Sequence, residues 1–122
     1  MPRKILIIDD EYDLLELEKN RLEAKGYVVI TTSDGIEGIV RAREEKPDLI
    51  IMDILMPNLN GYALIRELRR DPEIKSIPVL VLTSQDQLKD LFLLENVQHE
   101  DFLLKPFNGD ELINRIIKIV GN

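Results

Sequence analysis

The stretch LIIMDILMPNLNG, residues 49–61, joins an uninterrupted apolar run to a carboxylate and then to a segment rich in Pro, Asn and Gly. The run at residues 49–52 is typical of a strand that is covered on both faces. The segment after Asp53 has the composition of a loop. Taken alone, Asp53 would be expected to end the strand and face water, as most aspartates do. Its role therefore depends on the residues that lie beside it.

Similar apolar runs recur along the chain and alternate with helical patterns. The runs predict strands at residues 4–8, 27–32, 49–52, 77–82 and 101–104. Helical patterns lie between and after them, at residues 11–25, 36–45, 62–70, 85–97 and 108–120. This alternation predicts an α/β fold, a doubly wound (βα)5 sandwich around a five-stranded parallel sheet. We expect the flavodoxin-like strand order 2-1-3-4-5.

The limits of the first two helices can be predicted from local signals. The first helix would place Leu14, Leu17 and Leu22 on one side and stop at Gly26, which can adopt a left-handed conformation. The second helix would be stopped by Pro47.

The composition bounds the class of protein. With 122 residues, 44% of them hydrophobic, the chain has the size of one packed domain, and we expect a single domain over residues 1–122 without an output domain. The formal charge of −7 disfavours direct binding to nucleic acid or to an acidic membrane. The chain has no cysteine, no signal-peptide pattern and no apolar run near the roughly 18 residues of a membrane span. We therefore expect a cytoplasmic protein.

Reactive side chains follow four of the five predicted strands. Ligands of open α/β sheets bind beyond the carboxyl ends of the strands, where the strand order reverses. The residues at these ends are Asp9-Asp10-Glu11 after the first strand, Asp53 after the third, Thr83-Ser84 after the fourth and Lys105-Pro106 after the fifth. In the expected order the acidic residues converge on one edge, and Thr83 and Lys105 approach it from the far side.

This set of residue types fits one chemistry. Carboxylates held close together repel one another unless a cation compensates them, and Mg²⁺, with Mn²⁺ as a second candidate, is the hard cation that suits oxygen ligands. A carboxylate can also act as a nucleophile and form an aspartyl phosphate. Lys105 would supply positive charge to the transferred group, and the Thr83 hydroxyl would supply a hydrogen bond. Singly, each of these residues has an ordinary role as a helix cap or a solvated charge; jointly, they favour a phosphoryl-transfer site.

At these motifs the chain resembles the response-regulator receiver domain of two-component signalling, in particular its chemotaxis regulators, over essentially its whole length. The resemblance rests on ILIIDDE, on DILMPNLNG from Asp53, on VLTS around Thr83 and on DFLLKPF ending at Phe107. It implies a signalling switch, and not an enzyme with a separate substrate: the domain catalyses only its own Mg²⁺-dependent phosphorylation and dephosphorylation. The implied partners are a sensor histidine kinase or phosphotransfer protein and a downstream protein or output domain.

The resemblance also implies which residues form the metal and phosphoryl sites. Asp53 would accept the phosphoryl group from a phosphohistidine or a small phosphodonor. Asp10, Asp53 and the backbone carbonyl of Leu55 would bind Mg²⁺ directly, whereas Asp9 would act through a metal-bound water.

The remaining implied roles concern the switch. Lys105 would pair with the phosphoryl group, and its peptide bond to Pro106 would be cis. Thr83 would bond a phosphoryl oxygen and let Phe102 turn inward. The added charge would thereby change the surface formed by the fourth helix, the fifth strand and the fifth helix.

Three features depart from the family pattern. Phe102 stands where the family often has tyrosine, so that it offers no hydroxyl to a partner. Gln98-His99 replaces a common Gly-Ala, and the fourth helix would have to end at Asn96 instead. That helix is also apolar on nearly every side, through Leu88, Leu91, Phe92, Leu93, Leu94 and Val97. Its outer face would bury in a partner, as in a homodimer through the fourth and fifth helices, or it is an ordinary core helix with exposed leucines.

Three other functions are compatible with the same fold. A phosphatase-type Mg²⁺ enzyme usually carries its nucleophile in a D-x-D run after the first strand, where this chain has Asp9-Asp10-Glu11. A flavin-binding domain would need phosphate-binding loops rich in Ser, Thr and Gly, and acidic loops repel phosphate. A degenerate receiver would bind partners without phosphorylation, although all of the expected site residues are present here.

Overall fold

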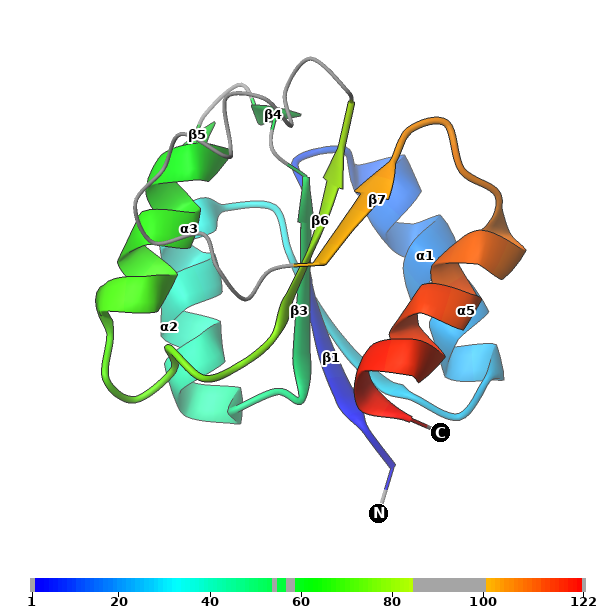
Figure 1. The fold of residues 1–122 in the computed structure, drawn as a ribbon, viewed down its shortest axis with the longest axis horizontal. Helices are drawn as coiled ribbons and strands as arrows, with labels where there is room; N and C mark the ends of the chain where they lie inside the picture. Colours follow the sequence, from blue (N-terminus) through cyan, green and yellow to red (C-terminus); the bar gives the residue numbers. More distant parts are fainter. Residues whose placement is uncertain (1, 54, 57–58, 85–100, 122) are drawn as a thin grey trace.

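A computed structural model describes residues 2–53, 55–56, 59–84 and 101–121. Within this part of the chain, one parallel sheet is formed by β1 (Lys4–Ile8), β2 (Val28–Thr32), β3 (Leu49–Asp53), β6 (Val79–Thr83) and β7 (Asp101–Leu104). The strands lie in the order β2-β1-β3-β6-β7, which is the predicted order 2-1-3-4-5 when they are counted along the chain (Figure 1).

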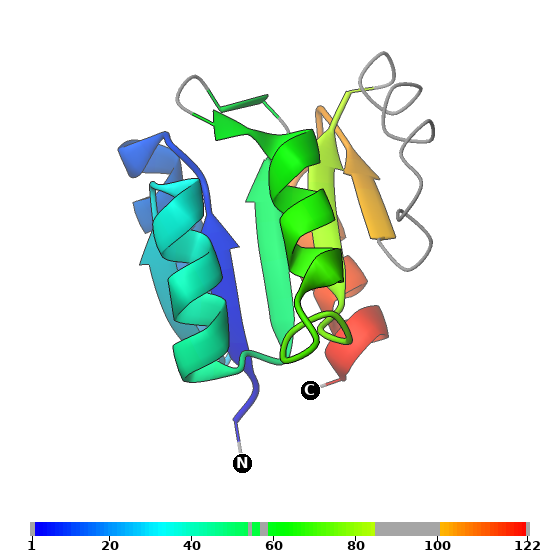
Figure 2. The ribbon, with the colours of Figure 1, turned by 90° about the vertical axis from the view of Figure 1, so that its left-hand side faces the viewer.

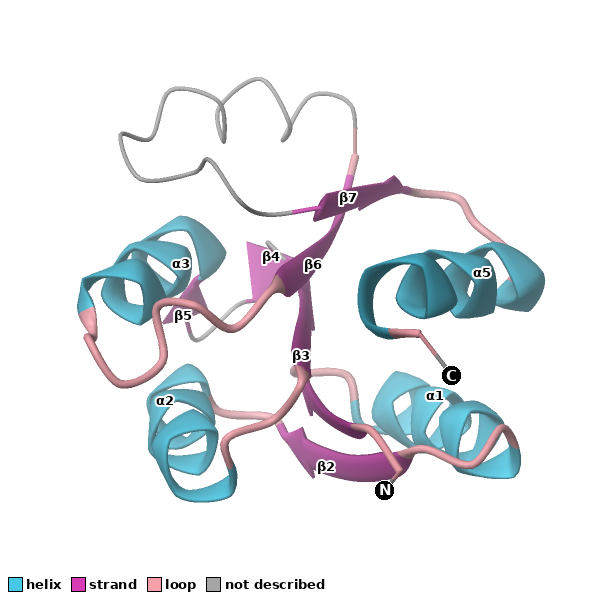
Figure 3. Ribbon diagram, turned by 60° about the horizontal axis from the view of Figure 1, so that its bottom comes forward, coloured by secondary structure: helices cyan, strands magenta, loops and turns pink. Residues whose placement is uncertain are grey.

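Helices cover both faces of this sheet. They are α1 (Tyr12–Ala24), α2 (Gly35–Glu45), α3 (Gly61–Arg70) and α5 (Gly109–Val120). α1 and α5 lie on one face, and α2 and α3 lie on the other (Figure 2, Figure 3). The predicted doubly wound α/β fold is therefore confirmed. The helix predicted at residues 85–97, with the expected end at Asn96, lies outside the described residues; of the described helices, none is long and apolar enough to cross a membrane.

The strand sequences are nearly continuous apolar runs because a hydrophobic core lies on each face of the sheet. Ile5 and Ile7 of β1 pack with apolar residues of α1 and α5. Leu6 and Ile8 point to the opposite face and pack with apolar residues of α2 and α3. Successive side chains of a strand point to opposite faces of the sheet. A strand that is covered on both faces therefore buries nearly all of its side chains, which are mostly apolar.

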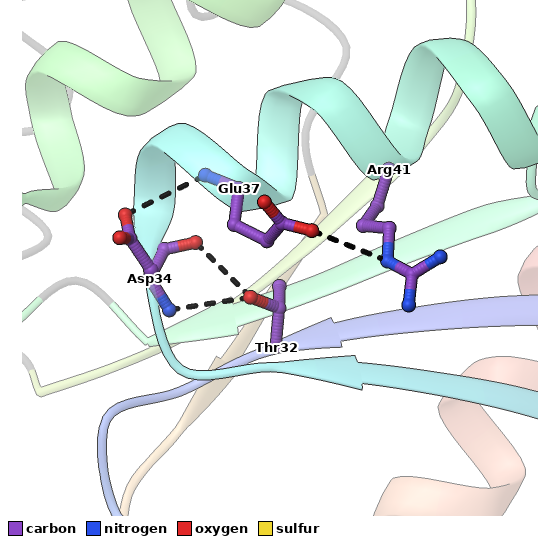
Figure 4. A network of polar contacts seen from close by, with 4 residues as sticks. All are labelled: Thr32, Asp34, Glu37 and Arg41. Atoms are coloured by element: carbon purple, nitrogen blue, oxygen red, sulfur yellow. Dashed lines mark hydrogen bonds and ion pairs between the residues drawn. The ribbon is translucent and has the colours of Figure 1, made fainter.

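The helix ends follow local chemistry. Gly26 has a φ of 95°, the left-handed conformation predicted for it. α2 begins after Asp34, whose Oδ1 accepts a hydrogen bond from the backbone N–H of Ile36 at 2.8 Å. The backbone N–H of Asp34 in turn donates to Oγ1 of Thr32, the last residue of β2, at 3.3 Å (Figure 4). The polar residues that follow β2 therefore cap a helix, in agreement with the lack of a reactive group predicted at this strand end.

The segment after Asp53 differs from the prediction of a plain loop. A short antiparallel pair forms there between β4 (Leu55–Met56) and β5 (Leu59–Asn60), at the edge of the molecule where β3 and β6 end (Figure 1). The Pro and Asn content of this stretch favoured a loop. Two residues separate Met56 from Leu59, however, and that spacing is also the one that joins the strands of a tight hairpin.

The buried face of α1 also differs from the predicted one. Leu22 is fully buried, but Leu17 is 52% exposed. The buried residues of α1 are Leu15, Glu18 and Leu22, which share a stripe at the helical spacing i, i+3, i+7. Leucines at positions 14, 15, 17 and 22 fit more than one helical stripe, so their spacing alone does not determine which side of α1 is buried.

Substitutions on α1 test this orientation. Leu22→Ala should lower the free energy of unfolding by about 2 to 5 kcal/mol because it leaves a cavity in the core. Leu17→Ala, the matched change on the exposed face, should alter it by no more than about 0.5 kcal/mol. Urea denaturation followed by circular dichroism measures both values. Equal losses for the two variants would contradict the observed orientation of α1.

Candidate functional site

The strand register places the ends of three strands at one edge of the sheet. Ile8 of β1 lies opposite Met52 of β3, so the next residues, Asp9 and Asp53, are neighbours across the two strands. Asp53 itself lies opposite Leu82 of β6, and Thr83 follows at the end of that strand. Asp53 and Thr83 are the last residues of their strands, not the first residues of loops. The sheet therefore holds them rigidly at the edge where ligands of this fold class bind.

Lys105 joins this edge from β7. Its backbone N–H donates to the Thr83 carbonyl oxygen at 2.8 Å, which extends the ladder between β6 and β7 by one residue. Its Nζ donates to Oδ2 of Asp53 in an ion pair. The Asp53 side chain is only 6% exposed, whereas the Lys105 side chain is 41% exposed. The peptide bond between Lys105 and Pro106 is cis, the conformation that the family resemblance implies.

Asp9 is a buried carboxyl group whose two oxygens differ in their hydrogen bonding within the described residues. Its Oδ1 accepts a hydrogen bond from the backbone N–H of Glu11 at 3.0 Å. Its Oδ2 is also buried and has no hydrogen-bond partner among the described residues. Burial raises the pKa of Asp9 to about 6; the hydrogen bond from Glu11 opposes this rise, and the negative charges of Asp53, Asp10 and Glu11 add to it.

These residues fit a divalent cation. A buried carboxylate oxygen without a donor is costly unless a ligand compensates it, and the neighbouring carboxylates reject further negative charge. Within the described ranges, no three acidic or imidazole groups are already gathered into a ligand cluster. Mg²⁺ does not require such a cluster, because it retains several waters and needs only one or two carboxylates. Asp10, which is half-buried, follows Asp9 directly. Leu55, the first residue of β4, lies two positions after Asp53.

The expected switch residues lie at the same edge and beside it. Thr83 is completely buried, and its hydroxyl donates to the Ser84 carbonyl oxygen at 3.2 Å. Phe102 of β7 is half-buried and packs against the core between the sheet and α2 and α3. Its carbonyl oxygen accepts a hydrogen bond from Nη1 of Arg115 on α5 at 2.5 Å. The site residues are thus connected through β7 to the surface of α5.

Glu18 is a residue near this site that the sequence analysis did not identify. It is 3% exposed, and neither of its carboxylate oxygens has a hydrogen-bond partner among the described residues. Burial raises the pKa of Glu18 to about 7, and the charges of Asp9 and Asp53 add to the rise while Lys105 and Arg21 oppose it. The signal that would have revealed it is the helical spacing between Glu18 and its buried neighbours on α1.

Comparison with known families gives a match over most of the chain. A family model described as the response regulator receiver domain matches residues 5–117. The chain is 38% identical over 120 residues to the alkaline phosphatase synthesis transcriptional regulatory protein PhoP of Bacillus subtilis, and the match covers 98% of this chain but 49% of that protein. It is 37% identical over 118 residues to protein PilH of Pseudomonas aeruginosa, with 97% of this chain and 98% of that protein covered. For PhoP and several other relatives, the chain spans about half of their length.

A solved structure gives a similar result. The receiver domain of the sensor histidine kinase PA1611 from Pseudomonas aeruginosa superposes with a TM-score of 0.84 and is 28% identical, with 100% of both chains covered. That structure has a magnesium ion coordinated in its active-site cleft.

The raised pKa of Glu18 makes stability depend on pH. In the folded protein this pKa is about 7, above the ordinary value of 4.5. The folded state therefore binds the proton more tightly than the unfolded chain, and this stabilisation is fully present below about pH 4.5 and is lost as pH rises through about 7. Between about pH 5.5 and pH 8 the loss should be about 2 kcal/mol in the free energy of unfolding.

Glu18→Leu should remove this part of the pH dependence, since leucine does not titrate and suits the buried stripe. Glu23→Leu, on the exposed side of the same helix, should keep the wild-type dependence. Urea denaturation at the two pH values measures the difference. The same slope in wild type and Glu18→Leu would show that Glu18 is not the buried titrating group.

Proposed function

The chain belongs to the response regulator receiver domain family, and from this we propose that it is a phosphorylation-dependent switch in which Asp53 accepts the phosphoryl group. The observation that carries the proposal is the ion pair between Asp53 and Lys105 at the carboxyl edge of the sheet. It combines a buried carboxylate, rigidly held at the end of a strand, with a cation that remains partly accessible to solvent. Phosphoryl transfer to an aspartate requires a carboxylate as the nucleophile and a positive charge that stabilises the transferred group.

The proposed reaction is a direct displacement at phosphorus. A carboxylate oxygen of Asp53 forms a bond to the phosphorus of a phosphohistidine or of an acyl phosphate such as acetyl phosphate. The bond from that phosphorus to the donor's nitrogen or oxygen breaks, and its electron pair leaves with the imidazole or with acetate. The sheet contributes by holding Asp53 in position, and the Lys105 ammonium contributes by stabilising the charge on the transferred group.

Mg²⁺ would be held by Asp10, Asp53 and the backbone carbonyl of Leu55, with Asp9 acting through a bound water. When bound, Mg²⁺ neutralises charge on the phosphoryl oxygens during the transfer. Two observations support this assignment. The Oδ2 atom of Asp9 is buried without a hydrogen-bond partner among the described residues, and the similar PA1611 receiver domain has a magnesium ion in its active-site cleft.

The switch would act through the residues that connect this edge to α5. Phosphorylation adds about −1.5 to −2 charges and new acceptor oxygens. Lys105 would then pair with the phosphoryl group, Thr83 would donate its hydroxyl to a phosphoryl oxygen, and Phe102 would turn inward. Contacts that support this path are the backbone bond from Lys105 to Thr83 and the bond from Arg115 to the Phe102 carbonyl.

Partners follow from the same proposal. The phosphodonor would be a sensor histidine kinase or a phosphotransfer protein in the cytoplasm. The surface of β7, α5 and the helix predicted at residues 85–97 would contact a downstream protein, an output domain or a second copy of the chain. We propose one receiver domain over residues 1–122; the relatives include both a protein of similar length, PilH, and longer regulators such as PhoP.

Replacement of Asp53 tests the proposed phosphoacceptor. Wild-type protein incubated with acetyl phosphate and Mg²⁺ should gain one labile phosphoryl group, and intact-protein mass spectrometry detects it. Asp53→Asn should gain none because the amide is not a nucleophile, whereas Asp13→Asn, an exposed site in the first turn of α1, should behave as wild type. Chelation of Mg²⁺ should also prevent the gain. Steady release of phosphate from varied substrates would instead indicate a phosphatase.

Replacement of Lys105 tests the second group of the proposed site. Lys105→Met should slow the formation of the adduct on the order of 100-fold, since it removes the charge that stabilises the transferred group. Lys75→Met, at an exposed lysine outside the site, should leave the rate unchanged. The time course of phosphorylation, followed by mass spectrometry, gives both rates. An unchanged rate in Lys105→Met would remove Lys105 from the reaction.

A further inference from the structure

Glu18 is a carboxylic acid inside the hydrophobic layer that joins α1 to the sheet. Its neighbours on the buried stripe, Leu15 and Leu22, belong to the same core as Leu112 and Ile116 of α5. A third apolar residue would complete the stripe without cost, whereas a glutamate must bury a polar group. Neither oxygen of Glu18 finds a hydrogen-bond donor in the described part of the chain. Among the described residues, Glu18 therefore has no hydrogen-bond partner that would explain its burial.

The charges that act on Glu18 belong mainly to the proposed phosphoacceptor site. Asp9 at the end of β1 and Asp53 at the end of β3 disfavour its ionised form. Lys105, which follows β7, and Arg21, one turn along α1, favour the ionised form. Glu18 makes no hydrogen bond to any of these groups and is eight positions or more from the aspartates in sequence. Its connection to the site is therefore electrostatic, acting through a medium of low dielectric constant.

We propose that Glu18 is a positioning residue that links cation binding at the acidic edge to release of a proton: its carboxyl binds a proton more tightly while the edge holds no divalent cation, and releases the proton more readily when Mg²⁺ binds there. This inference rests on the Mg²⁺ site of the proposed function. The direction follows from the charges. Two aspartates oppose ionisation of Glu18, and a nearby cation of charge +2 reverses the sign of that field.

The coupling has a consequence for regulation. Linkage between two binding sites is reciprocal. If binding of Mg²⁺ lowers the proton affinity of Glu18 by some factor, then protonation of Glu18 lowers the affinity for Mg²⁺ by the same factor. The ionised form of Glu18 attracts the cation, and the protonated form does not. The affinity for Mg²⁺ should therefore rise as pH rises through the neutral range, where Glu18 titrates, which would make the phosphoacceptor site sensitive to pH.

Nuclear magnetic resonance of the side-chain carboxyl carbons tests this directly in the full chain labelled at glutamate. The Glu18 signal, assigned by its loss in Glu18→Gln, should titrate near pH 7 without Mg²⁺. With saturating Mg²⁺ its midpoint should fall by at least about one pH unit, a tenfold change in proton affinity. The signal of Glu23, exposed on the same helix, should be the same with and without Mg²⁺ at each pH. Glu18→Leu provides the assignment if Glu18→Gln does not fold.

Calorimetric titration with Mg²⁺ gives an independent readout. Between pH 6 and pH 8, the Mg²⁺ affinity of wild-type protein should rise by about fivefold to tenfold more than that of Glu18→Gln. A Glu18 midpoint near its ordinary value of 4.5, or one that stays near 7 with Mg²⁺ bound, would overturn the coupling and leave the proposed phosphoacceptor intact. Failure of the wild-type protein to bind Mg²⁺ at all would instead overturn the proposed metal site, and the coupling with it.

Discussion

The ion pair between Lys105 and Asp53 is the interaction on which the rest of the site depends. It lies at the edge where a parallel sheet brings the ends of its strands together, and the strand register leaves two buried aspartates side by side there. Buried carboxylates repel each other and are not solvated by water, so these aspartates need a nearby positive charge in order to remain ionised. Lys105 supplies one such charge from a neighbouring strand. Any process that changes the charge on Asp53 must therefore change the position or the partner of Lys105.

The fold and the arrangement of the site follow largely from sequence because both depend on strong local patterns. Continuous apolar runs that alternate with helical stripes define the doubly wound sheet, and its connectivity determines which strand ends meet. Asp9, Asp53, Thr83 and Lys105 could thus be expected at one edge from the sequence alone. The cis bond before Pro106 required the family resemblance, since nothing in the composition of the segment implies it.

The errors have a different origin. β4 and β5 depend on backbone pairing across two residues, and the composition of that stretch favoured a loop. The predicted orientation of α1 was wrong because its four leucines fit more than one helical stripe. Packing against α5 and the sheet selects the stripe that contains Leu15 and Leu22. Glu18 was missed for the same reason: a glutamate is normally placed on the exposed side of a helix, and its helical spacing from Leu15 and Leu22 marks it as buried only when their stripe is the one chosen.

A protein that only needed stability would place an apolar residue at position 18 and fewer carboxylates at the sheet edge. The chain instead retains Asp9 and Glu18, both buried with an oxygen that lacks a donor in the described structure. Such groups destabilise the fold and are usually retained where function requires them. A site built to receive a cation and a phosphoryl group would explain both residues by a single cause.

The central claim is that Asp53, and no other residue, carries the phosphoryl group. Borohydride reduces an aspartyl phosphate to homoserine, so reduction after incubation with acetyl phosphate and Mg²⁺, followed by peptide mass spectrometry, locates the modified residue. We expect homoserine at position 53 alone. Homoserine at position 9 or 10, or a phosphorylated protein whose label lies on His99 and yields no homoserine, would contradict the claim.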